Sequence, residues 1–200
     1  MNVRFTFSAL LAAGAVFSQA DTLHVLGYNF GGVGSIGISS PIVGTGHDNS
    51  FNGVLNGTTN IPVMFCFDLF QDLSVPKTFT VTIEHHMTSE AWVIDNASSV
   101  LAGHTAVQID EATQIAVWEL EYPTFATSSA SALELSLASD LVTADGSGTL
   151  KALDTEYIYN GGRPGSGGQS MITGFTVPGP AAMAPFAVGL IGLLRKRFRA

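Results

Sequence analysis

The chain has a single cysteine, Cys66, among its 200 residues. A disulfide needs two thiols, so an intramolecular disulfide framework is excluded and stability must come from a hydrophobic core. Basic side chains are also scarce. Residues 21–176 hold three of them, Lys77, Lys151 and Arg163, against all sixteen acidic side chains, so this segment has a formal charge of −13. Because nucleic acids bind basic surfaces, we expect no nucleic-acid partner.

Charged residues make up only 12% of the chain, whereas glycine is frequent, with 22 residues. Short apolar runs between turn-forming residues are typical of a β-rich body. Residues 78–83 alternate between apolar and polar side chains, and residues 132–141 do so through Leu133, Leu135 and Leu137, which predicts two strands. We therefore predict an α+β domain that is mainly β, with a β-sandwich or barrel-like body and a short helix.

Histidines and acidic residues do not form a recognisable metal motif. His85 and His86 end a predicted strand, where adjacent side chains point to opposite faces. Asp48 and Asn52 lie in a polar hairpin region, residues 44–57, without the full ligand spacing of a calcium loop. We predict no metal and no cofactor. No pattern places a base near the cysteine either, so we do not expect a cysteine hydrolase or another enzyme.

The cysteine lies in a nearly continuous apolar run, residues 62–70, which is typical of a buried strand. A lone buried cysteine is usually a chemically inert core residue. On this interpretation Cys66 is a free thiol that fills space in the core.

A second informative segment is residues 110–122, which we predict to be a helix through about Leu120, with Asp110 as its N-cap. Gln114 and Trp118 then lie one turn apart on the same face. The alternative is a strand, because Trp118, Leu120 and Tyr122 also alternate with acidic residues.

These two segments, FCFDL at residues 65–69 and TQIAVWE at residues 113–119, together resemble the paired motifs of bacterial surface thioester domains. The resemblance implies that the Cys66 sulfur attacks the Gln114 amide and releases ammonia. The internal acyl thioester then reacts with a nucleophile on a partner, such as an extracellular polysaccharide or another surface group. Water hydrolyses thioesters, so apolar walls are needed. The candidate shielding side chains are Phe65, Phe67, Ile115 and Trp118.

Residues 1–20 have the pattern of a secretory signal peptide. Arg4 precedes an apolar run over residues 5–17, and the small residues Ser18 and Ala20 predict cleavage between Ala20 and Asp21. The alternative is a buried N-terminal helix.

The last segment, residues 177–200, combines a proline motif, an apolar stretch over residues 181–194 and a basic cluster. The motif consists of Val177, Pro178, Gly179 and Pro180, and the cluster of Arg195, Lys196, Arg197 and Arg199. This order resembles the PEP-CTERM protein-sorting signal, also known as an ice-binding-protein C-terminal motif, although Gly179 stands where that family has glutamate. The resemblance implies a transient membrane anchor and an exosortase-like processing enzyme. The basic cluster would stop transfer through the membrane.

Taken together, the sequence predicts an exported bacterial protein that is sorted to the cell surface or an extracellular matrix and carries a covalent adhesin domain. The alternative is a non-reactive structural matrix protein with Cys66 as a buried free thiol. Ice binding is not predicted, because the body has no regular Thr-rich repeat.

Overall fold

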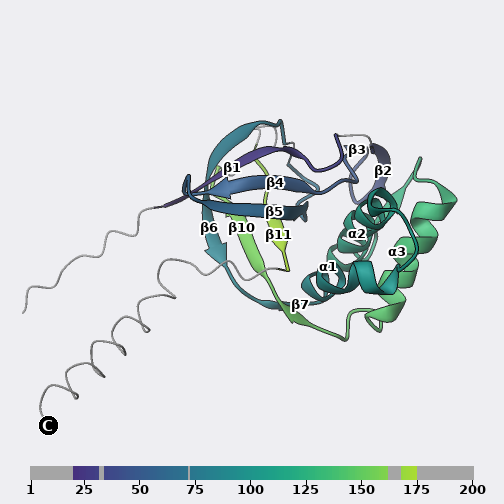
Figure 1. Ribbon diagram of the computed structural model, residues 1–200. Helices are drawn as coiled ribbons and strands as arrows, with labels where there is room; N and C mark the ends of the chain where they lie inside the picture. Colours follow the sequence, from purple (N-terminus) through teal and green to yellow (C-terminus); the bar gives the residue numbers. More distant parts are fainter. Residues whose placement is uncertain (1–19, 32–33, 72, 162–167, 175–200) are drawn as a thin grey trace, which may run out of the picture.

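A computed structural model describes residues 20–31, 34–71, 73–161 and 168–174 of the chain. The fold is α+β and mainly β, as the sequence predicts. Six strands form a closed antiparallel barrel in the order β1-β4-β5-β11-β10-β6 (Figure 1). Their bounds are β1 Asp21–Tyr28, β4 Phe51–Leu55, β5 Thr59–Cys66, β6 Lys77–Glu84, β10 Thr155–Tyr159 and β11 Met171–Thr173.

The barrel interior is built by the period of two along its strands. Leu23 and Val25 of β1 are fully buried, and Phe79 and Val81 of β6 lie in the same core, as their alternation predicts. Closure gives each strand a neighbour on both sides, but the strands differ in length, so a strand end can extend beyond its neighbour.

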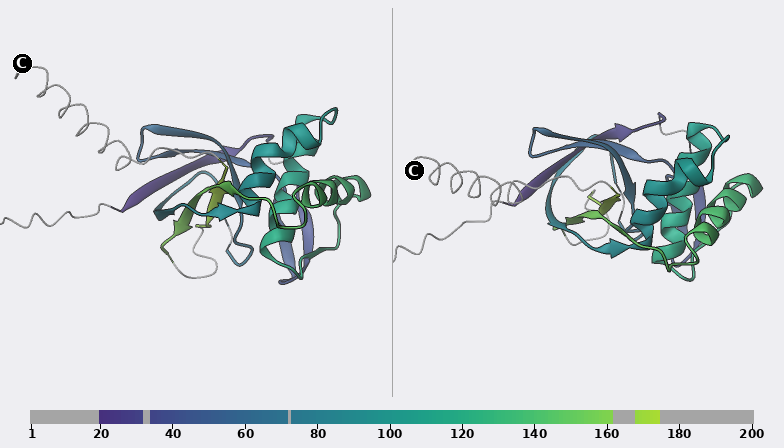
Figure 2. Two further views of the ribbon diagram at one scale, coloured as in Figure 1. Left: turned by 90° about the horizontal axis from the view of Figure 1, so that it is seen from below. Right: turned by 60° about the horizontal axis from the view of Figure 1, so that its bottom comes forward.

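Three helices lie together at one side of the barrel (Figures 1 and 2): α1 Ser89–Val100, α2 Ala106–Glu121 and α3 Ala132–Ala144. Each begins at a residue with a hydroxyl side chain. Thr88 caps α1, while Thr105 and Ser131 form capping boxes with Gln108 and Glu134 at the starts of α2 and α3.

The predicted strand through Leu133, Leu135 and Leu137 is wrong, because these residues belong to α3. Leu137 is buried together with Leu141 one turn later, whereas Leu133 and Leu135 are 46% and 38% exposed. The capping box at Ser131 starts a helix, and packing of its Leu137 face overrides the local alternation.

Two small sheets complete the described structure. β2 Ile36–Ser40 pairs with β3 Gly44–Gly46 and with β8 Ala126–Thr127, and β7 Met87–Thr88 pairs with β9 Ala152–Leu153. A Cβ atom at Gly46 would lie 2.9 Å from the Trp118 ring, so the absence of a side chain there lets the three-stranded sheet approach α2.

Most of the predicted targeting features lie outside the described residues. The signal peptide core, the motif at residues 177–180 and the basic cluster at residues 195–199 are among them. β1 begins at Asp21, directly after the exposed Ala20. Among the helices of the described segments, none has the length and apolar character needed to cross a membrane.

Candidate functional site

Cys66 and Gln114 lie side by side, although 48 positions separate them in the sequence. Cys66 is the last residue of β5, and Gln114 lies near the middle of α2. The Cys66 backbone N–H donates to Gln114 Oε1 at 2.9 Å, and Gln114 Nε2 donates to the Cys66 carbonyl at 2.6 Å. Both groups of the side-chain amide are therefore fixed on one residue, and the amide is fully buried.

The Gln114 amide takes the place of a missing strand. Backbone groups of successive strand residues point to opposite sides, and the Phe67 N–H donates to Ser170 next to β11. The N–H and C=O of Cys66 therefore point to the other side, toward β4. However, β4 begins at Phe51, whose partner on β5 is Met64, so no strand residue is paired with Cys66 there. The amide supplies the donor and the acceptor that a strand would have supplied.

Helix α2 presents Gln114 from its most buried stretch, since every residue from 112 to 118 is buried. The expected N-cap at Asp110 is wrong, because the helix begins at Ala106, after the Thr105 cap. Asp110 instead accepts a hydrogen bond from the Ser50 backbone N–H at 2.7 Å. This contact ties α2 to the segment just before β4, and so helps to set the position of Gln114 relative to the barrel.

The Cys66 thiol is almost completely buried, with 2% of the residue exposed. Burial raises its pKa well above the usual range, and the charge of Asp68 raises it further, whereas the nearby Trp118 indole N–H lowers it. The sulfur contacts the Asp68 carbonyl at 3.4 Å. The indole N–H of Trp118 makes no hydrogen bond within the described part of the chain, so a buried donor remains available beside the sulfur.

Two of the four expected shielding residues lie in the same core cluster as Cys66. Ile115 and Trp118 belong to the same core cluster as Cys66, whereas Phe65 and Phe67 pack in a second cluster around Val117. The period of two along a strand explains this difference from the expectation, because neighbours of Cys66 must point to the opposite face.

A pocket of about 630 Å³ opens beside Cys66. Its apolar wall is formed by Trp118 and by aromatic residues from three other segments, Tyr28, Phe51 and Phe70. Sequence reasoning missed these three as pocket residues. Tyr28 and Phe51 lie in other strands, far from Cys66 along the chain, and no local pattern shows that Phe70, four residues after Cys66, lines the same pocket.

The turn after Cys66 is held by two side chains that sequence reasoning also missed. The Tyr122 hydroxyl donates to the Phe67 carbonyl at 3.0 Å and accepts from the Leu69 N–H at 3.3 Å. Gln169 Nε2 donates to the Asp68 carbonyl at 2.6 Å. Burial raises the pKa of Tyr122 to about 12, so its hydroxyl stays protonated at neutral pH.

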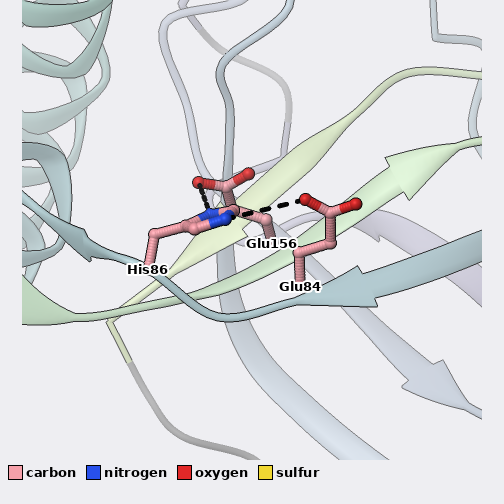
Figure 3. Close-up of side chains that lie close together, drawn as sticks. All are labelled: Glu84, His86 and Glu156. Atoms are coloured by element: carbon pink, nitrogen blue, oxygen red, sulfur yellow. Dashed lines mark hydrogen bonds and ion pairs between the residues drawn. The ribbon is translucent and has the colours of Figure 1, made fainter.

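A separate polar cluster lies at the surface of the barrel (Figure 3). His86 is placed between Glu156, at 3.2 Å from Nδ1, and Glu84, at 3.7 Å from Nε2. The hydrogen bond and charge of Glu156 raise the pKa of His86. His85 contacts the Asp154 carbonyl instead, at 2.9 Å. Neither histidine lines the pocket beside Cys66, so neither is placed to act on its thiol.

The chain was compared with protein-family models, with curated proteins and with solved structures, and none of the three comparisons gives a match.

Proposed function

We propose that residues 21–176 form a covalent attachment domain that uses an internal thioester between Cys66 and Gln114. The observation that supports this proposal best is the pair of hydrogen bonds that fixes the Gln114 amide on the Cys66 backbone. The fold thus holds the Gln114 amide against the backbone of the residue that carries the thiol before any bond forms. Positioning of this kind is a large part of the advantage of intramolecular reactions.

Bond formation needs no further reactant. The Cys66 sulfur adds to the side-chain carbonyl carbon of Gln114 and forms the C–S bond. The C–N bond breaks, and the NH₂ group leaves with the thiol proton as ammonia. The Cys66 N–H donates to Oε1, the oxygen that gains negative charge during the addition. A donor aimed at this oxygen stabilises the tetrahedral intermediate.

The second step is the attack of a partner nucleophile, an amine or a hydroxyl, on the same carbon. The C–S bond breaks, the partner becomes an amide or ester of the former Gln114 side chain, and the nucleophile's proton goes to the departing sulfur. The buried Trp118 N–H, which lacks a partner among the described residues, can donate to this sulfur as negative charge develops on it. Burial protects the bond from water, and the adjoining pocket gives the nucleophile a route to it.

The proposed setting is the cell exterior. We propose that residues 1–20 direct export and that residues 177–200 hold the chain in the membrane until an exosortase-like enzyme cuts near Pro178. The domain then reaches the cell surface or an extracellular matrix, where hydroxyl-rich polysaccharide is a suitable nucleophile. The alternative is a structural matrix protein in which Gln114 only completes the barrel edge and Cys66 stays a thiol.

Labelling with a biotinylated primary amine tests the proposal. We expect the folded wild-type protein to gain one label, which peptide mapping locates at Gln114, and to expose one new thiol. Cys66→Ala and Gln114→Ala should each abolish labelling. Gln108→Ala, in the first turn of the same helix, is the matched control and should be labelled normally. An unlabelled wild-type protein, or a label that persists in Cys66→Ala, would refute the thioester.

A further inference from the structure

Three acidic side chains from separate segments meet next to the helices. Asp48 lies between β3 and β4, Glu111 is in α2, and Glu134 is in the first turn of α3. Each offers one carboxylate oxygen, and these oxygens lie within 4.8 Å of one another. Figure 1 shows the three elements adjacent to one another, with β3 above α2 and α3.

Asp48 is the unusual member of this cluster. The residue is 2% exposed, and its Oδ1 is buried without a hydrogen-bond partner among the residues that the structure describes. Gly34 packs directly against this carboxylate, where any side chain would collide with it. A buried, unpaired carboxylate oxygen costs free energy, so its presence indicates a missing partner.

Burial raises the pKa of Asp48, and among its neighbours His47 acts in the opposite direction and lowers it. Both ion pairs within the described segments contain His86. Neither Lys77 nor Lys151 pairs with any of the three carboxylates. Burial and the charges of Asp48, Glu134 and Asp110 raise the pKa of Glu111 to about 7. The cluster is therefore a site where carboxylates oppose one another and where a cation would relieve the repulsion.

We propose that Asp48, Glu111 and Glu134 bind a calcium ion. The ligands are all oxygen atoms, which hard cations such as Ca²⁺ prefer. Two oxygens bound to one Ca²⁺ at about 2.4 Å are at most about 4.8 Å apart, and the observed separations meet that limit. Mg²⁺ demands near-ideal octahedral geometry and gives up its water reluctantly, so carboxylates from three separate segments suit the more flexible coordination of Ca²⁺ better. Water completes the coordination, because three carboxylates supply fewer than the six to eight oxygens of a typical site.

The ion would reinforce links that the fold already makes, such as the hydrogen bond from Ser50 to Asp110. It would connect the segment before β4, the first half of α2 and the start of α3. Glu134 can keep its helix-capping role while it binds the ion, since its Oε2 accepts from the Ser131 N–H at 2.7 Å and a carboxylate has two oxygens. Glu111 lies one turn before Gln114, but the proposed calcium site does not depend on the thioester.

The cluster of Glu84, His86 and Glu156 is a useful contrast (Figure 3). Its carboxylates face a histidine that supplies positive charge when protonated, so their repulsion is already compensated. These groups are also more exposed. We therefore expect calcium to select the first cluster over this one.

Terbium luminescence and calcium competition test the site. Tb³⁺ replaces Ca²⁺ at oxygen sites, and we expect excitation of tryptophan to sensitise its emission. Added Ca²⁺ should displace Tb³⁺ and quench this emission, whereas the same concentration of Mg²⁺ should not. Glu111→Gln and Glu134→Gln should each weaken Ca²⁺ binding more than about tenfold, since even the loss of an outer contact costs about that much. Glutamine preserves the capping box at position 134. Glu156→Gln is the matched control and should bind normally.

Thermal unfolding distinguishes a calcium ion bound by the three carboxylates from a proton that they share. With calcium, wild-type Tm should rise relative to EDTA, whereas Glu111→Gln should show no rise and should equal or exceed wild-type Tm in EDTA, because repulsion is relieved. Cys66→Ala should keep the calcium response, so failure of the thioester and failure of the metal site are distinguishable. The proposal would be overturned if millimolar calcium does not raise the Tm of the wild-type protein, or if calcium raises the Tm of Glu111→Gln by the same amount.

Discussion

Replacement of Cys66 by alanine should have a much larger effect on stability if the thioester is present than if it is absent. A covalent link between residues 48 positions apart restricts the unfolded chain, and loop-closure entropy for a loop of this size corresponds to about 4 kcal/mol at room temperature. Loss of the buried sulfur atom itself costs about 1 kcal/mol, as for other single-atom deletions in a core. The free energy of unfolding should therefore fall by about 5 kcal/mol with the thioester and by about 1 kcal/mol without it.

Urea denaturation followed by tryptophan fluorescence measures this difference, because Trp118 is buried in the same core as the thiol. Ile115→Val is the matched control. It removes one heavy atom from a fully buried neighbour of Gln114 and should cost about 1 kcal/mol in either case. The urea m-value should also rise in Cys66→Ala, because an unfolded chain without the cross-link exposes more surface. If Cys66→Ala and Ile115→Val lose equal stability with unchanged m-values, the cross-link is absent.

Three further predictions concern the surroundings of the site. Gln114→Ala should be roughly 2 kcal/mol or more less stable than Cys66→Ala by urea denaturation, because both backbone groups of Cys66 lose their partners; equal stabilities would show that water replaces the amide. Tyr122→Phe should lower the free energy of unfolding by about 1 to 3 kcal/mol, since its hydroxyl satisfies two backbone groups of the turn after Cys66, and an unchanged value would contradict that role. The pKa of His86 is raised in the folded state, so protonation of His86 stabilises the fold. This contribution to the free energy of unfolding is complete below about pH 6.5, the ordinary pKa of histidine, and is lost as the pH rises through the raised pKa. The Tm of His86→Gln should accordingly change less than that of the wild type between about pH 6 and pH 8, and equal changes would rule out a contribution from the contact with Glu156.

The strand that contains Cys66 and the helix that contains Gln114 could both be predicted from sequence, because each has a local signal. A continuous apolar run predicts a buried strand, and β5 ends at Cys66. Spacing of apolar residues predicts a helix around Gln114, although its start was placed at Asp110 instead of after Thr105. Threonine followed three residues later by Gln108 was the available signal for the true start.

Features that depend on contacts between segments far apart in the sequence could not be predicted from local patterns. Alternation through Leu133 and Leu137 resembles a strand, and only the contacts of α3 with the rest of the core show that one face of a helix is buried. In the same way, the sides to which Phe65 and Phe67 point follow from the pairing of β5 with its neighbours, and local composition does not reveal them.

The carboxylate cluster illustrates a third limit. Asp48, Glu111 and Glu134 have no regular spacing, so no metal motif is visible along the chain. They meet only because the segment before β4, α2 and α3 pack together. Ligand sets assembled from separate elements become recognisable once the tertiary structure places their oxygen atoms near one another.

The intact mass of the purified, never-denatured protein tests the central claim most directly. The thioester account predicts a mass lower than the sequence mass by one ammonia, with the deficit absent from both Cys66→Ala and Gln114→Ala. Resistance to alkylation in the folded state is not sufficient, because a buried thiol with a raised pKa also resists it. A wild-type protein with the full sequence mass, whose Cys66 is alkylated completely on unfolding, would contradict the thioester and leave Gln114 as a structural partner of the barrel edge.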